Sequence, residues 1–166
     1  MPPTLRVGIS INEYLAMQFE QECELIAGEL RPKPMGTREH SRMQGRLYVR
    51  LLNQFGELRT GLQFSVRNVE DVLIPDICIA ADDNPALYRD VLDEAPLFCV
   101  EIVSPSQRPG ELFVKCEMYH EWGVEFCWVV DPVVKRAWNY HAGMHAAAEI
   151  FDALSGPMTL PLSEIF

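Results

Sequence analysis

The clearest hydrophobic pattern in the chain is a helical repeat over residues 37–58. Apolar side chains recur there on one arc of the helical wheel, at about 100° per residue. They are Met43, Leu47, Leu51, Phe55 and Leu58. The opposite arc carries four arginines: Arg38, Arg42, Arg46 and Arg50. We expect a helix with its apolar face on the core, and the arginines either contact phosphate groups or form the solvated face.

Two further helices are predicted from their end signals. Pro109 suits the first turn of a helix and Gly123 suits its end, so we expect a helix over residues 109–122. Ser10 and Glu13 have the spacing of a capping box, in which each side chain bonds the backbone of the other residue. A short helix is therefore expected from Ser10 to about residue 21.

Apolar runs between the helices predict strands. A hairpin is expected at residues 24–30, because Gly28 tolerates the positive φ that a tight turn needs. Other strands are expected at residues 62–68, 72–80, 97–103, 125–130 and 135–141. Pro75 interrupts one of them and lacks a ladder donor, so it belongs at a bulge or an edge. An acidic, solvated loop is expected over residues 82–94.

Length and composition bound the architecture. The 166 residues, 48% hydrophobic and 23% charged, predict one globular domain over residues 1–166 with its core at about 11–141. The expected strands and helices together indicate a chain that contains both α and β structure. The net charge of −10 argues against attachment to nucleic acid by overall positive charge, but a local basic surface remains open.

The chain has no signal for a membrane or for the secretory pathway. No apolar run approaches the roughly 20 residues of a membrane span, and the first residues lack a signal-peptide core. We expect a cytoplasmic protein with no membrane partner. Its five cysteines contain no Cys-x-x-Cys pair and several lie in apolar runs, so they are expected to be reduced core thiols rather than zinc ligands.

Two carboxylates interrupt apolar strands. Glu101 lies within a strand that is apolar on both faces, and Asp76 lies within another apolar run. A buried carboxylate costs several kcal/mol unless it is paired, hydrogen-bonded or bound to a cation. Side by side, the two would suit Mg²⁺ or Mn²⁺, which prefer oxygen ligands. The alternative is that one or both lie at a strand end and meet water or arginine.

Two further polar residues lie on apolar helix faces. Lys115 falls between Tyr119 and other apolar positions of its helix, so its ammonium needs a buried anion; the alternative is an exposed pair with Glu111 one turn away. His40 projects into the apolar arc of the first long helix, either as a core histidine or as part of a polar site. An amine beside two metal-binding carboxylates is what phosphoryl transfer to water needs.

Several short motifs occur together in one order. They are Pro75-Asp76, Val100-Glu101-Ile102-Val103-Ser104-Pro105-Ser106, Glu111-Leu112-Phe113-Val114-Lys115, Tyr119, Gly123-Val124 and Trp128-Val129-Val130-Asp131-Pro132, with Glu24-Leu25-Ile26-Ala27-Gly28-Glu29-Leu30 and His40 upstream. This set resembles the Uma family of bacterial proteins, a domain of unknown function placed in the PD-(D/E)XK nuclease superfamily. The resemblance covers about residues 11–140. It implies an α/β fold with a restriction-endonuclease-like core, in which a central mixed sheet is flanked by helices, together with an N-terminal helix and hairpin.

The resemblance also implies roles for individual residues. Asp76 and Glu101 would be the metal-binding carboxylates, with the backbone carbonyl of Ile102 as a further ligand. Lys115 would be the displaced active-site lysine, because the usual position two residues after the glutamate holds Val103.

The remaining family positions are less uniform. Glu24 would be an earlier acidic residue of the site and His40 a polar neighbour. Where the family generally has aspartate four residues before the lysine, this chain has Glu111.

Two functions from different classes follow from these residues. The first is a Mg²⁺- or Mn²⁺-dependent nuclease with DNA or RNA as substrate, in which a metal-activated water attacks phosphorus. The alternative is a catalytically inactive nuclease-fold module that binds a partner or regulates. A serine hydrolase using Ser104 or Ser106 has little support, because no nucleophile-elbow pattern surrounds either residue. A homodimer is conceivable if a final strand pairs across a two-fold axis.

Overall fold

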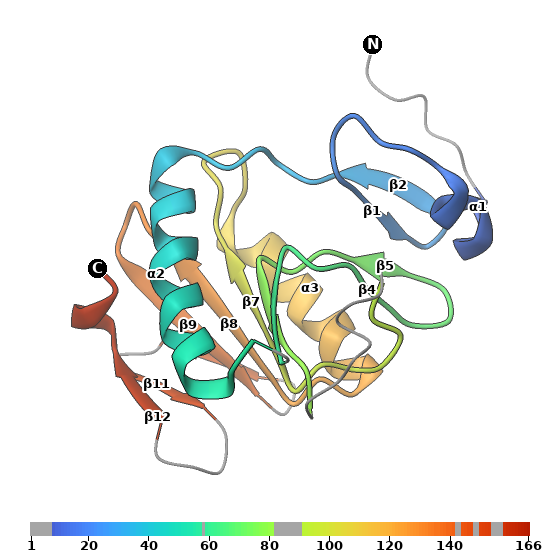
Figure 1. Ribbon diagram of the computed structural model, residues 1–166. Helices are drawn as coiled ribbons and strands as arrows, with labels where there is room; N and C mark the ends of the chain where they lie inside the picture. The colour runs from blue at the N-terminus through green and yellow to red at the C-terminus, as the bar shows by residue number, and fades with distance from the viewer. Residues whose placement is uncertain (1–7, 58, 82–90, 142–143, 148–149, 154–157) are drawn as a thin grey trace.

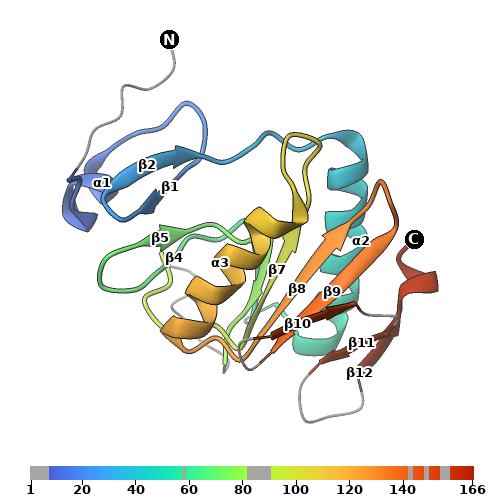
Figure 2. The same ribbon diagram turned by 180° about the vertical axis from the view of Figure 1, so that it is seen from behind.

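A six-stranded sheet lies at the centre of the molecule, with one long helix on each face (Figures 1 and 2). The computed structural model describes residues 8–57, 59–81, 91–141, 144–147, 150–153 and 158–166. Most of the acidic loop expected at residues 82–94 lies outside the described residues.

The central sheet is mixed, as the sequence predicts. Its strands, in spatial order, are β10 (Met144–Ala147), β9 (Arg136–His141), β8 (Phe126–Asp131), β7 (Phe98–Ile102), β6 (Ile77–Ile79) and β3 (Thr60–Leu62). The β7 and β8 strands are parallel and the other neighbours are antiparallel. Two parallel neighbours need a crossover, which α3 (Pro109–Trp122) provides.

The two long helices confirm the predictions from the helical repeat and the end signals. Thr37 caps α2 (Arg38–Phe55) through its side-chain oxygen, and α3 ends at Gly123 in the left-handed conformation. The α2 helix covers one face of the sheet and α3 covers the other (Figures 1 and 2).

Alternation along β7 divides the core between these faces. Phe98 and Ile102 join the cluster under α2, whereas Cys99 joins the cluster under α3. The same alternation turns Glu101 toward α3. The carboxylate of Glu101 therefore enters the layer that contains the side chains of that helix.

A smaller antiparallel sheet stands beside the central one. Its order is β2 (Glu29–Pro32), β1 (Cys23–Ile26), β5 (Val72–Leu73) and β4 (Val66–Arg67). The predicted hairpin joins β1 to β2 through Ala27 and Gly28, both at positive φ (51° and 75°). The helix α1 (Ile11–Ala16) has the predicted capping box but ends earlier than expected, because Met17 is already extended.

The expected strands at residues 62–68 and 72–80 are each divided in two. Residues 74–76 leave the ladder at Pro75, and side chains from elsewhere satisfy their backbone groups. Glu24 Oε1 accepts a hydrogen bond from Ile74 N at 2.8 Å, and Lys33 Nζ donates to Ile74 O. Each divided strand thus contributes to both sheets, and the break lies where the sheets meet.

The end of the chain packs against α2. Before it, β11 (Ile150–Ala153) and β12 (Met158–Pro161) form a separate two-stranded sheet, and the short helix η2 (Leu162–Glu164) follows. Ile165 is fully buried in the cluster under α2. Arg46 donates to Ile165 O at 3.0 Å and Arg50 pairs with Glu164 at 2.6 Å. Two of the four arginines on the polar face of α2 therefore bind the end of the chain rather than a phosphate group.

The remaining expectations concern the cysteines and the membrane. All five cysteines are buried free thiols, as predicted from the apolar runs that contain them. Among the described residues, no helix combines the length and the apolar character needed to cross a membrane.

Candidate active site

A small cavity of about 20 Å³ lies at the junction of the two sheets and the starts of α2 and α3, with room for about one water molecule or ion. All the residues that the sequence suggested for the site line it. The lining residues are Glu24, Lys33, Pro34, His40, Asp76, Glu101, Ile102, Ser104, Gln107 and Lys115.

Asp76 is fixed by groups on three sides. In the β6–β7 register Ile77 pairs with Val100, so one further step places Asp76 opposite Glu101. Asp76 Oδ2 accepts a hydrogen bond from Ile102 N at 2.7 Å, and Lys33 Nζ lies 2.9 Å from Oδ1. At 1% exposure, this carboxylate depends on the protein for its stabilisation.

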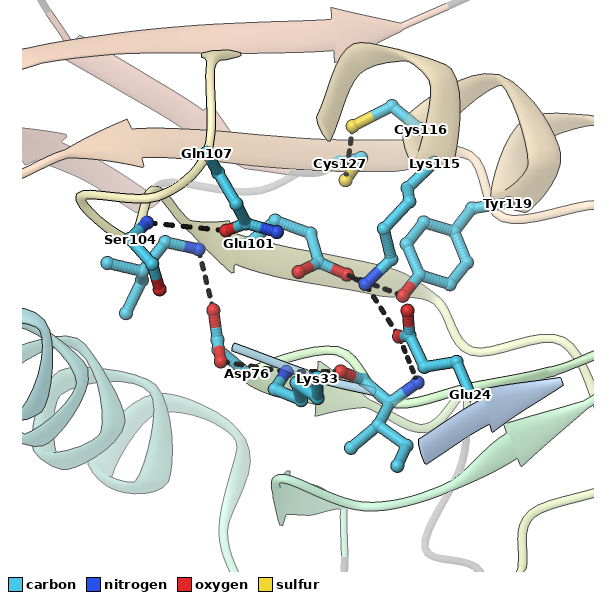
Figure 3. Close-up of polar contacts among 12 residues, drawn as sticks. Glu24, Lys33, Asp76, Glu101, Ser104, Gln107, Lys115, Cys116, Tyr119 and Cys127 are labelled. Atoms are coloured by element: carbon cyan, nitrogen blue, oxygen red, sulfur yellow. Dashed lines mark hydrogen bonds and ion pairs between the residues drawn. The ribbon is translucent and has the colours of Figure 1, made fainter. Parts of the chain in front are cut away.

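Glu101 and Lys115 form the second half of the site (Figure 3). Lys115 Nζ lies 2.6 Å from Glu101 Oε1, and the Tyr119 hydroxyl donates to the same oxygen at 2.6 Å. Lys115 and Tyr119 are four residues apart on α3, so both reach the carboxylate from one helix face. The alternative of an exposed pair with Glu111 is not what the structure shows, because Lys115 turns inward and Glu111 is exposed.

Glu24, on the hairpin strand β1, connects the part of the site around Asp76 to the part formed by Glu101 and Lys115. Its Oε1 accepts from Lys115 Nζ at 2.7 Å and from Ile74 N at 2.8 Å. One carboxylate oxygen therefore positions the lysine ammonium and caps the interrupted strand next to Asp76. Figure 3 shows Lys115 extending between Glu24 and Glu101.

His40 lies in the first turn of α2, where Thr37 accepts a hydrogen bond from its backbone N–H. Its Nε2 is 3.3 Å from Asp76 Oδ2, and the residue is buried. Of the two roles that the sequence left open, the position in the polar site is the one observed. Gln44, one turn later, donates to Asp76 O at 3.0 Å and anchors the same segment.

The local charges shift the pKa values of three groups. Burial opposes ionisation of Asp76, but the Lys33 ammonium and His40 outweigh it and hold its pKa below the usual value. Burial raises the pKa of Glu101 against the lowering effect of the Lys115 ammonium. Burial also disfavours the charged form of Lys115, but Glu101 and Glu24 raise its pKa above the ordinary lysine value.

The donor set fits a hard divalent cation. Asp76 Oδ1 is buried yet accepts no hydrogen bond within the described part of the chain, although Lys33 lies beside it as an ion-pair partner. The described residues contain no cluster of three or more His, Cys, Asp or Glu side chains that could hold a metal. Asp76, Glu101 and Ile102 line the cavity together, and Mg²⁺ commonly binds one or two carboxylates with waters completing its shell.

Sequence reasoning missed one ionisable group of this cavity. Lys33, between Pro32 and Pro34, follows the hairpin in a segment for which the sequence suggested no site residue. The available signal was composition: the chain has three lysines, and two of them, Lys33 and Lys115, line this cavity. Tyr119 was noted for its place on the helix wheel, but its hydrogen bond to Glu101 was not foreseen.

The chain is a mixed α/β protein with two principal sheets, and paired acids and lysines meet where these sheets join. A solved structure with a similar fold is described as a putative nuclease belonging to DUF820 from Anabaena variabilis ATCC 29413. It has a TM-score of 0.79 and 20% identity, and the match covers 95% of this chain and 97% of that one. The chain belongs to the Uma2 family, described as "Putative restriction endonuclease", whose model matches residues 11–166. A comparison with curated proteins finds no match.

Proposed function

We propose that the protein is a metal-dependent nuclease that hydrolyses phosphodiester bonds of DNA or RNA. One observation carries the proposal: two buried carboxylates, Asp76 just before β6 and Glu101 on β7, line one cavity with the ammonium of Lys115. Membership of a family described as "Putative restriction endonuclease" supports the same class of substrate. Hydrolysis of a phosphodiester needs these parts in one place.

The residues of the site have separable tasks in this proposal. Asp76, Glu101 and the Ile102 carbonyl would hold Mg²⁺ or Mn²⁺, which supplies an activated water and neutralises phosphate charge. Lys115 carries a fixed positive charge that stabilises the charge developing on the phosphate oxygens. Tyr119 and Glu24 hold Glu101 and Lys115 in position, and His40 does the same for Asp76.

One observation favours a second candidate, a nuclease-fold module without catalysis. Each of the two carboxylates already has an ammonium partner, because Lys33 pairs with Asp76 and Lys115 pairs with Glu101. A cluster that neutralises itself in this way can be stable without a metal. In that case the domain would bind a partner or nucleic acid rather than cleave it.

The test is a cleavage assay on single-stranded DNA, duplex DNA and structured RNA in Mg²⁺ or Mn²⁺. Asp76→Asn, Glu101→Gln and Lys115→Met should each lower the rate by about 100-fold or more, the usual cost of losing one charge-stabilising group. Glu111→Gln and Lys135→Met are the matched controls, since both residues are exposed. No cleavage by the wild type, or equal cleavage by all variants, would refute the nuclease and leave the binding module.

The variants should also separate metal binding from turnover. Asp76→Asn removes a metal ligand, so it is expected to lose both Mn²⁺ binding and cleavage. Lys115→Met removes no ligand, so calorimetry should still detect Mn²⁺ while cleavage is lost. Turnover retained in Lys115→Met would contradict the role given to that lysine.

A further inference from the structure

Lys33 is a second buried lysine of the site, and neither the family resemblance nor the proposed chemistry assigns it a task. Its Nζ lies 2.9 Å from Asp76 Oδ1 and donates to the carbonyl of Ile74. Its side chain is 9% exposed. The ammonium therefore lies directly beside the carboxylate oxygen that a metal would use.

The backbone of Lys33 is fixed as firmly as its side chain. Its N–H donates to Glu22 O at 2.7 Å, and its carbonyl accepts from Gln21 Nε2 at 2.6 Å. Prolines on both sides restrict the chain further. A lysine held in this way is part of the site and not a mobile surface charge.

Counting charges shows what Lys33 contributes. The cavity is lined by three carboxylates, of Glu24, Asp76 and Glu101, and by two ammonium groups, which leaves one excess negative charge when His40 is uncharged. One divalent cation converts this to one excess positive charge, which matches a single phosphodiester. Without Lys33 the loaded site would be neutral and would attract a phosphodiester less.

We propose that Lys33 acts as a resident cation of the site, which weakens divalent-metal binding at Asp76 and supplies the positive charge that attracts one phosphodiester group. This inference rests on the proposed nuclease function. It names the residue whose positive charge attracts the negatively charged substrate. It matters particularly in a chain whose net charge is −10, because the surroundings otherwise repel a polyanion.

The proposal predicts opposite effects on two ligands. Lys33→Gln keeps a donor for Ile74 O but removes the charge beside Asp76. In calorimetric titrations it should bind Mn²⁺ about tenfold tighter than wild type, because a like charge has been removed. A merely structural role would weaken Mn²⁺ binding as the site loosened.

The second experiment measures nucleic-acid binding by fluorescence anisotropy in saturating Ca²⁺, with labelled single-stranded DNA, duplex DNA and RNA 20-mers. Lys33→Gln should bind the oligonucleotide preferred by the wild type about tenfold more weakly, and the slope of log affinity against log salt should fall by about 1. Lys135→Gln, at an exposed lysine, is the matched control and should behave as wild type.

A charge-preserving variant keeps the test decisive. Lys33→Arg should resemble wild type with both ligands; if it resembles Lys33→Gln, shape and not charge is responsible and the inference is wrong. Equal or weaker Mn²⁺ binding by Lys33→Gln, or unchanged oligonucleotide binding, would also overturn it while leaving the nuclease proposal intact. If no protein binds Mn²⁺, the metal-dependent nuclease fails, and the inference fails with it.

Discussion

Asp76 shows how a buried carboxylate depends on its immediate partners. Lys33 and His40 outweigh the effect of burial and hold its pKa below the ordinary value of 3.8, so its ionised form stabilises the folded chain above that pH. This stabilisation is lost as the pH falls through the folded-state pKa. The site should therefore be weakened by acid rather than by mild alkali.

The amide variant Asp76→Asn tests this linkage in metal-free buffer. At neutral pH it should unfold about 3 kcal/mol more easily than wild type, because Lys33 is left without its anion. The difference should shrink as the pH falls from 3.8, where Asp76 of the unfolded chain becomes protonated, toward the lower pKa of Asp76 in the folded chain. Urea unfolding across this range measures the effect, and a difference independent of pH would contradict it.

Tyr119 offers a second prediction at the residue scale. Its hydroxyl donates to Glu101 at 2.6 Å inside the core under α3. Tyr119→Phe should lower the free energy of unfolding by about 1.5–3 kcal/mol, the usual value of a hydrogen bond to a charged group. Urea unfolding of Tyr140→Phe provides a buried tyrosine for comparison, and equal losses in both variants would argue against a special bond to Glu101.

Residues whose chemistry conflicts with their own segment could be found from the sequence. Glu101 stands out because its strand is otherwise apolar, and Lys115 stands out on an apolar helix face. Lys33 has no such conflict, since its neighbours are prolines. Its partner Asp76 lies far along the chain, and only the tertiary fold brings the two together.

At the scale of elements, strong local signals gave correct predictions and tertiary effects gave the errors. The hairpin, α2, α3 and β7 each carry a turn, a cap or a clear repeat of their own. The break at residue 64 lacks such a signal, whereas Pro75 marks the break at residues 74–76. Glu24 on β1 and Lys33 after β2 stabilise this second break by binding the backbone of Ile74.

A pair of glycine variants tests the local logic of these elements. Gly28 has φ +75°, and an added Cβ would lie 3.2 Å from the Gly8 backbone, so Gly28→Ala should destabilise the chain by about 1–2 kcal/mol. Gly45 lies within α2 with nothing within 4 Å of an added Cβ. Gly45→Ala should instead stabilise it by about 0.5–1 kcal/mol. Thermal or urea unfolding that gave both variants the same sign would contradict the argument.

For the molecule as a whole, the C-terminal segment was the part least legible from the sequence, yet it completes the core under α2. Ile165 is fully buried there, its carbonyl accepts a hydrogen bond from Arg46, and the preceding Glu164 pairs with Arg50. A short segment packed by contacts with a distant helix has little local pattern to detect. Its stability depends on α2 being formed.

Ile165→Ala is the corresponding test. Removing this buried side chain should cost about 2–5 kcal/mol of unfolding free energy, as for other large-to-small core changes. Val69→Ala, at a residue that is 91% exposed, should change little. If urea unfolding shows Ile165→Ala to be as stable as Val69→Ala, the segment does not pack on the core in solution.

The central claim is that Asp76 and Glu101 share one divalent cation in a cavity that also contains two lysines. The most direct measurement is anomalous diffraction from a crystal soaked in Mn²⁺. We predict a manganese ion bonded to oxygens of both carboxylates and of Ile102, with Lys115 still beside Glu101. A manganese ion that contacts only one of the two carboxylates, or none, would contradict it.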